Sequence, residues 1–191
     1  MIRAFVAVPV DEPVVRRRLT GARSLLPPLG GIRWIPEGQL HFTLKFLGEI
    51  EEDRVPDARA ATAGAAVAPP FRLALEGLGA FPPRGPARVL WAGCGEGAGA
   101  LSALAASVEE DFAARGFPRE ARPFSPHLTL ARVKDPDAGR RLSRALPSVP
   151  PEPFGTVTVS SLVLFRSELT TRGAEHAELL RVPIESPAAP Q

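Results

Sequence analysis

The sequence predicts an α+β fold built from antiparallel sheets. Segments with strand-like alternation and segments with helical periodicity are mixed along the 191 residues, without the regular alternation of strand and helix that a parallel sheet requires. The chain also divides into two halves of similar content, each with one histidine-containing strand. Because 45% of the residues are hydrophobic, the chain is able to bury a sizeable core.

The first half predicts two strands, each followed by a helix, and then a pair of strands. Apolar residues recur at helical spacing after Asp11, whose carboxylate we expect to cap that helix. A later alanine-rich segment has Pro56 in its first turn, where proline is tolerated. In chain order, we expect a strand at 2–8, a helix at 11–26, an extended piece at 33–35, a strand at 40–47, a helix at 51–68, and strands at 71–78 and 88–93.

The second half repeats this mixture. An amphipathic stripe of leucine, alanine, valine and phenylalanine predicts a helix. Pro126 favours extended backbone before the second histidine, and Asp135-Pro136 is typical of a helix start. We expect a helix at 98–115, a strand at 127–133, a helix at 135–146, a strand rich in β-branched residues at 156–165, a closing strand at 178–184, and a disordered tail at 186–191.

Composition excludes several classes of protein. The formal charge of +2 is too small to act as a strong field, although nearly all the basic residues are arginines, whose planar fork suits phosphate. Cys94 is the only cysteine, so no intrachain disulfide is possible. The apolar start is too short for a signal peptide or a membrane span. We therefore expect a cytoplasmic protein that is not inserted in a membrane.

Two of the predicted strands carry the same motif. His41 and Thr43 lie within one His-x-Thr-Leu segment, and His127 and Thr129 lie within another, 86 positions further on (127 − 41). Residues two apart in a strand point to the same face, so each segment presents an imidazole beside a hydroxyl. A single strand histidine is more often structural. The chain has three histidines, however, and two of them share this setting, which favours catalysis.

Two imidazoles suit a reaction that removes one proton and delivers another in the same turnover. Histidine has an ordinary pKa of about 6.5, so it serves either task near neutral pH. The adjacent threonine hydroxyls are neutral donors that bind anionic oxygens without cancelling the proton chemistry. The pattern therefore predicts a phosphate group held between His41 and His127.

These motifs resemble the signature of the two-histidine phosphoesterases. Their surroundings resemble the bacterial and archaeal RNA 2',3'-cyclic phosphodiesterases, also named 2'-5' RNA ligases. The matching stretches occur in the family's order over nearly the whole chain: Arg3–Ala7, Leu40–Gly48, Gly79–Pro82, Val89–Gly93 and Pro123–Arg132.

The resemblance implies a single bilobal, pseudo-symmetric domain over residues 1–185, with two antiparallel sheets flanking a central cleft and helices outside. It implies hydrolysis of terminal 2',3'-cyclic phosphates on RNA to 2'-phosphates, without a metal or other cofactor. By analogy His127 is the base that activates water and His41 the acid that protonates the departing 3'-oxygen. Thr43 and Thr129 hold the non-bridging oxygens. RNA ends or oligonucleotides with a cyclic phosphate are the expected partners, and we expect a monomer.

Two charged residues are further candidates for phosphate binding. Arg132 lies five residues after His127, where the family has an arginine that touches phosphate. Strict alternation puts that offset on the opposite face, so a bulge or a strand end must intervene. Lys45 has the right parity beside Thr43 to supply charge, and a solvated edge lysine is an equal alternative.

Two rings are further candidates for contact with a nucleobase. Trp34 and Phe5 offer faces on which an unpaired base could stack, and the alternative is that both belong to the core. Near the C-terminus the family often has an aromatic residue where this chain has His176. A stacking role is therefore not carried over to that position.

Other functions fit the sequence less well. A zinc site would need three or four ligands at matched spacing, and no Cys-x-x-Cys or His-x-x-x-His unit exists. The segment 93–98 formally fits the dinucleotide-binding pattern Gly-x-Gly-x-x-Ala, which a flexible turn into a helix also explains. A non-catalytic nucleotide-binding module using the same cleft remains the alternative from another class, and joining of RNA ends through a 2',5' bond is the reverse chemistry.

Overall fold

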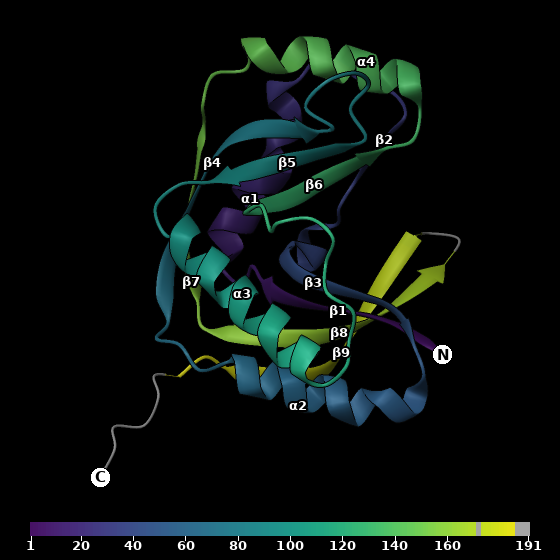
Figure 1. The fold of residues 1–191 in the computed structure, drawn as a ribbon. Coiled ribbons are helices and arrows are strands. Elements are labelled where there is room, and N and C mark those ends of the chain that lie inside the picture. The colour runs from purple at the N-terminus through teal and green to yellow at the C-terminus, as the bar shows by residue number, and fades with distance from the viewer. Residues whose placement is uncertain (171–172, 186–191) are drawn as a thin grey trace.

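The computed structural model describes residues 1–170 and 173–185, over which the strands form two antiparallel sheets (Figure 1). The four-stranded sheet has the order β3-β1-β8-β9 and the five-stranded sheet the order β2-β6-β5-β4-β7. The first consists of β1 (Ile2–Pro9), β3 (His41–Ile50), β8 (Ser161–Thr170) and β9 (Gly173–Pro183). The second consists of β2 (Ile32–Trp34), β4 (Phe71–Phe81), β5 (Val89–Cys94), β6 (His127–Val133) and β7 (Pro153–Val159). The predicted α+β class with two antiparallel sheets is confirmed.

The two sheets place their histidine strands in corresponding positions, apart from one added edge strand. Strand β3 pairs with β1 at the edge of its sheet, and β6 pairs with β5 in the other sheet, where β2 is added on the outer side of β6. The sheets come together where β3 and β6 lie against each other (Figure 1). The duplicated motif of the sequence therefore becomes a duplicated strand position in the fold.

The helices lie outside the sheets, and two of them cross between the halves (Figure 1). Helix α1 (Pro13–Gly21) follows β1 but packs against β7, whereas α3 (Ala98–Ala114) follows β5 but packs against β3 and α2. Helix α2 (Val55–Ala65) covers β8 and β9, and α4 (Pro136–Ala145) packs on β6. Each half thus contributes a helix to the sheet of the other half.

Four short 3₁₀ helices complete the secondary structure of the described residues, at Ala22–Leu25 (η1), Glu37–Gln39 (η2), Glu52–Arg54 (η3) and Leu146–Ser148 (η4). The predicted stripe on α3 is buried as expected. Most of the buried side chains of both sheets belong to one continuous hydrophobic core. No helix of the described part is long and apolar enough to cross a membrane. The predicted tail at 186–191 lies outside the described residues.

Helix starts agree with the sequence in one case and differ in another. The side chain of Asp135 accepts hydrogen bonds from the backbone of Asp137 and Ala138, which caps α4 and lowers the pKa of the carboxyl group. The predicted cap at Asp11 is wrong because α1 begins only at Pro13. Asp11 instead forms ion pairs with Arg16 and Arg181, at 3.1 and 3.0 Å.

The single strand predicted at 156–165 is also wrong. Two strands, β7 and β8, meet at Ser160, where the chain leaves the five-stranded sheet for the four-stranded one. β-Branched residues favour extended backbone in both strands but carry no information about the pairing partner. Composition therefore identified the strand character and missed the crossing between sheets.

Candidate active site

The two histidine strands share one pattern of burial over six residues. From His41 to Phe46 and from His127 to Arg132, the side chains are in turn half-buried, buried, half-buried, buried, buried and exposed. The two consecutive buried residues coincide with register shifts against the neighbouring strands, which indicates a β-bulge in each strand. Side chains beyond the bulge change faces relative to strict alternation.

The bulge places Arg132 on the face of His127 and Thr129. The sequence analysis expected a bulge or a strand end between His127 and Arg132, and the bulge is present. Burial is the main cause that lowers the pKa values of His41 and His176 on the other sheet, and the positive charge of Arg132 adds a smaller contribution in the same direction. Among the described residues Arg132 forms no ion pair, so its charge is available to a ligand.

The corresponding bulge in β3 turns Lys45 away from the face of Thr43. The prediction that Lys45 and Thr43 share a face is therefore wrong. Lys45 is 2% exposed, and its Nζ donates to a carboxylate oxygen of Glu109 at 2.7 Å and to the carbonyl oxygen of Pro118 at 2.8 Å. The ammonium group therefore ties β3 to α3 and to the segment that follows α3. We leave Lys45 out of the proposed phosphate site.

Both catalytic candidates are anchored in the same way. His41 Nδ1 lies 2.7 Å from the carbonyl oxygen of Gln39, and His127 Nδ1 lies 2.7 Å from the carbonyl oxygen of Ser125. A carbonyl oxygen only accepts, so each Nδ1 carries a proton and donates it. Each Nε2 is therefore the nitrogen that exchanges a proton with a substrate.

Aromatic rings hold His41 in place. Phe5 stacks on His41 with ring centroids 5.0 Å apart, and Phe165 stacks on Phe5 at 5.2 Å. His176 meets His41 edge-on at 5.5 Å. Phe5 is only 4% exposed, so it supports the imidazole and is not the open stacking surface that we expected as one alternative.

The surroundings of His41 shift its pKa. Burial lowers the pKa of His41 to about 4, the hydrogen bond to Gln39 opposes this shift, and the charges of His176 and Arg132 add to it. His41 is therefore neutral at pH 7 in the free protein, with an unprotonated Nε2.

A tryptophan and a phenylalanine flank His127. Phe81 meets the ring of His127 edge-on at 5.0 Å, and Trp91 lies 6.4 Å from it. The indole of Trp91 occupies the space that a side chain at Gly79 would need, since a Cβ there would lie 2.1 Å from the indole Cη2. Glycine at position 79 thus allows the tryptophan to lie beside Thr129, its partner in register on β6.

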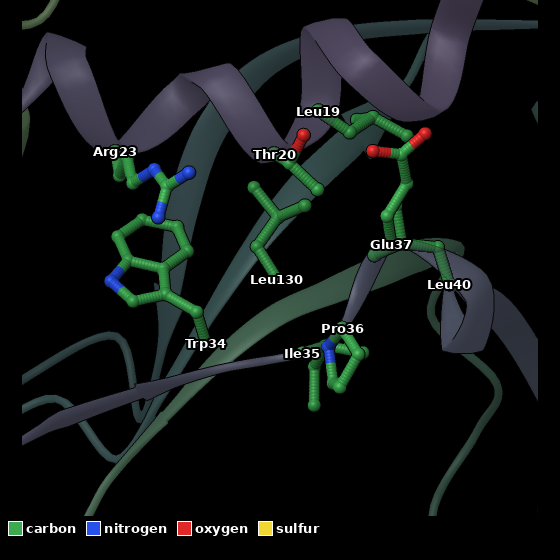
Figure 2. A pocket seen from close by; sticks show the side chains of 9 residues that line it. All are labelled: Leu19, Thr20, Arg23, Trp34, Ile35, Pro36, Glu37, Leu40 and Leu130. Carbon is green, nitrogen blue, oxygen red and sulfur yellow. The ribbon is translucent and has the colours of Figure 1, made fainter. Parts of the chain in front are cut away.

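Trp34 does not belong to this site. It pairs in register with Ala131, a core residue, and therefore points to the opposite side of β6 from His127. Figure 2 shows it beside Arg23 in a separate cavity of about 270 Å³ between α1 and the η2 segment. Trp34 packs against the hydrophobic core, as the second alternative expected, and we leave it out of the proposed site.

The remaining sequence candidates lie on facing strands. His41 and Thr43 on β3, and His127, Thr129 and Arg132 on β6, are presented where the two sheets meet. Sequence reasoning missed Phe46, which is 58% exposed and holds the place in its strand that Arg132 holds in the other. The signal was available, because each residue is the fifth after its histidine.

The alternative sites gain no support. Among residues 1–170 and 173–185, no group of three or more histidine, cysteine, aspartate or glutamate side chains is placed to hold a metal ion. Gly97 has a φ of +90°, and a Cβ there would lie 2.1 Å from the carbonyl oxygen of Arg72. Close packing against β4 therefore explains this glycine without a dinucleotide.

Comparison with known proteins agrees with this geometry. A family model described as the 2'-5' RNA ligase superfamily matches residues 9–171. The chain belongs to this superfamily. The match includes both histidine strands and both bulges, so the features described above are features of a family member.

Relatives and solved structures of the superfamily cover nearly the whole chain. A protein of Archaeoglobus fulgidus named RNA 2',3'-cyclic phosphodiesterase is 35% identical over 93% of this chain and 98% of its own length. A protein of the same name from Thermus thermophilus is 39% identical over 93% and 88%. The crystal structure of TT0787 from Thermus thermophilus has a TM-score of 0.76 at 37% identity, over 96% of this chain and 98% of that one.

A more distant structure shows the same fold. The Escherichia coli protein LigT in its apo form has a TM-score of 0.77 at 25% identity, over 97% of this chain and 98% of that one. Another structure of that protein is described as a complex with 3'-AMP, over 96% of this chain and 98% of that one, at a TM-score of 0.74 and 26% identity.

The placement of Lys45 leads to a prediction about stability. Replacing Lys45 with methionine should lower the free energy of unfolding by roughly 1–3 kcal/mol, because Glu109 then loses its cationic partner at a site where its side chain is 21% exposed. Urea denaturation measures this change. Lys134→Met, at an exposed lysine beyond the end of β6, is the matched control and should change stability little. A loss of activity far beyond the loss of folded protein would return Lys45 to the phosphate site.

The buried imidazole leads to a prediction about pH. The folded pKa of His41 is lowered to about 4, whereas the unfolded chain binds this proton near pH 6.5, so folding stability is lost as the pH falls from 6.5 towards 4. His41→Asn removes this dependence and should reduce the loss between about pH 7 and pH 4 by up to about 3 kcal/mol. Urea denaturation at both pH values tests this. Equal losses in the two proteins would contradict the lowered pKa.

Proposed function

We propose that the protein hydrolyses terminal 2',3'-cyclic phosphates of RNA and leaves 2'-phosphates. The observation that carries this proposal is the pair of equivalent strands, each with an anchored histidine whose Nε2 is free to exchange a proton and a threonine on the same face. The activity agrees with the name shared by the relatives from Archaeoglobus fulgidus and Thermus thermophilus.

The chemistry follows from these positions. Water attacks the phosphorus and gives a proton to one imidazole, while the bond between phosphorus and the 3'-oxygen breaks and that oxygen takes a proton from the other imidazole. The product carries a 2'-phosphate and a 3'-hydroxyl. Thr43 and Thr129 donate hydrogen bonds to the non-bridging oxygens, and the guanidinium of Arg132 stabilises the negative charge that grows on them.

The family analogy makes His127 the base and His41 the acid, and we retain this order. In this order the acid, His41, must carry a proton when the substrate is bound. The low pKa of His41 keeps the ring neutral in the free protein, so binding has to bring that proton. The bound cyclic phosphate must then raise the pKa of His41 until the ring takes up a proton from solvent. An anion within a few ångströms has this effect in a buried site because it stabilises the imidazolium. An exposed Phe46 beside the site suits stacking by the terminal base.

A second reaction uses the same groups with a different nucleophile. If a 5'-hydroxyl of a second RNA takes the place of water, its attack on the phosphorus with loss of the 3'-oxygen forms a 2',5' bond. The name of the superfamily agrees with this second activity. We keep cytoplasmic location and a monomeric state as expectations.

The direct test is incubation with an oligoribonucleotide that ends in a 2',3'-cyclic phosphate, in the presence of EDTA. We expect ring opening to a 2'-phosphate, identified by mass and by resistance to a 3'-specific phosphatase. His41→Ala and His127→Ala should each lose about 10²- to 10⁴-fold in turnover, because each removes one proton-transferring group.

The exposed residue Lys134 supplies the control for this assay, and Lys134→Ala should retain full turnover. A 3'-phosphate product, or a folded histidine variant with near-normal turnover, would refute the mechanism. Tight binding of the cyclic end without any turnover would identify the chain as a binding module.

The order of acid and base has its own test. A nucleoside 2',3'-cyclic phosphate does not titrate near neutral pH, so its binding to the His127→Ala variant reports proton uptake by the protein alone. Calorimetry at about pH 6 in buffers of different ionisation enthalpy should show uptake of close to one proton. This uptake should vanish when His41 is also replaced. Binding without uptake would reverse the order and make His41 the base.

A further inference from the structure

A second arginine lies beside Arg132 on the same face of the five-stranded sheet. Strands β2 and β6 pair antiparallel, with Arg33 directly opposite Arg132. Residues directly opposite each other in such a pair point to the same face. The next pair agrees, because Trp34 lies opposite the buried Ala131, whereas both arginines are exposed. Arg33 therefore faces the side of β6 that carries His127.

The charges of these two arginines are not neutralised within the described part of the chain. Over residues 1–170 and 173–185, neither Arg33 nor Arg132 forms an ion pair or a side-chain hydrogen bond. Exposed arginines elsewhere, such as Arg119 and Arg181, are paired with carboxylates. Directly opposite residues have Cβ atoms about 4.5–5.5 Å apart, and like charges at this spacing destabilise a sheet. An anionic ligand over the pair would remove this repulsion.

The two arginines differ in their relation to the catalytic candidates. Burial is the main cause that lowers the pKa of His41, and Arg132 is among the charges that add to it, whereas Arg33 is not. Strand β2 is the outermost strand of its sheet, so Arg33 lies one strand spacing, about 4.8 Å, beyond Arg132. A phosphate held between the two catalytic histidines is served by Arg132. Arg33 is left for an anionic group next to that phosphate.

We propose that Arg33 binds the phosphodiester on the 5' side of the terminal nucleoside, so that the protein prefers RNA chains to free nucleoside cyclic phosphates. The proposal rests on the function proposed above and names a substrate class for it. The terminal nucleoside of an RNA carries one phosphate in the cyclic ring and the next on its 5'-oxygen, so two adjacent arginines match two consecutive phosphates. A guanidinium suits a phosphodiester because it donates parallel N–H bonds to two of its oxygens. Such a contact reads no base.

Three probes isolate this contact: adenosine 2',3'-cyclic phosphate, a diadenosine dinucleotide with the same cyclic end, and that dinucleotide with an uncharged methylphosphonate linkage. We expect the wild type to open the charged dinucleotide with a higher kcat/KM than the other two. In Arg33→Gln this preference should fall about 2- to 10-fold, between the value of an exposed ion pair and that of a charge-assisted hydrogen bond. The fall should come from KM. The slope of log KM against log salt concentration should decrease by about 0.7, the value for one single-strand phosphate contact.

Arg23 supplies the matched control. It is also exposed and forms no ion pair among the described residues, but it lies beside Trp34 in the cavity on the other side of β2 (Figure 2). Arg23→Gln removes the same charge and should keep the preference for the charged dinucleotide. An equal fall in both variants would overturn the proposal, because it would show a general effect of charge. An unchanged preference in Arg33→Gln, or an equal rise in KM for the uncharged dinucleotide, would also overturn it.

Thermal unfolding distinguishes binding from a structural role. Arg33→Gln should unfold at a temperature equal to or above that of the wild type, because it removes a like charge opposite Arg132. A lower unfolding temperature together with equal rises in KM for all three probes would make Arg33 a structural residue and overturn the proposal. If the wild type binds these probes without opening them, the proposed function fails, and the same comparison made on Kd decides the role of Arg33.

Discussion

The site depends on two β-bulges, one in each histidine strand. Without them, strict alternation would turn Arg132 towards the helices and Lys45 towards the cleft. With them, the guanidinium faces the proposed phosphate position, and the ammonium reaches Glu109 in the interior. One extra residue in each strand therefore determines that Arg132 faces the proposed ligand position and that Lys45 is used in packing β3 against α3.

The sequence predicted most of the fold class and the central residues of the site because both depend on local patterns. The spacing of His41 to Thr43 and of His127 to Thr129 lies before the bulges, so alternation assigned their faces correctly. Alternation failed for Lys45, which lies beyond a bulge. The break at Ser160 was missed for a different reason, since strand pairing between distant segments decides which sheet a strand joins. The same kind of pairing turns Trp34 away from His127, and the sequence had left its role open.

Burial of aromatic and imidazole rings gives the four-stranded sheet its chemical character. Phe5 and Phe165 form a dry surface on which His41 is held neutral, and the anchored Nδ1 leaves only one nitrogen free to react. The five-stranded sheet holds His127 with Phe81 and Trp91, on space left by Gly79. Two halves with one motif thus surround two like residues with different rings.

The exchange of helices between the halves makes the folding of each half depend on the other. A single half, ending after β4, would carry α1 with no β7 to cover and would leave β3 without α3. Strand β4 would also lack β5 and β7, its two partners in the five-stranded sheet. Neither sheet is therefore complete until both halves of the chain are present, so the two histidine strands become ordered together.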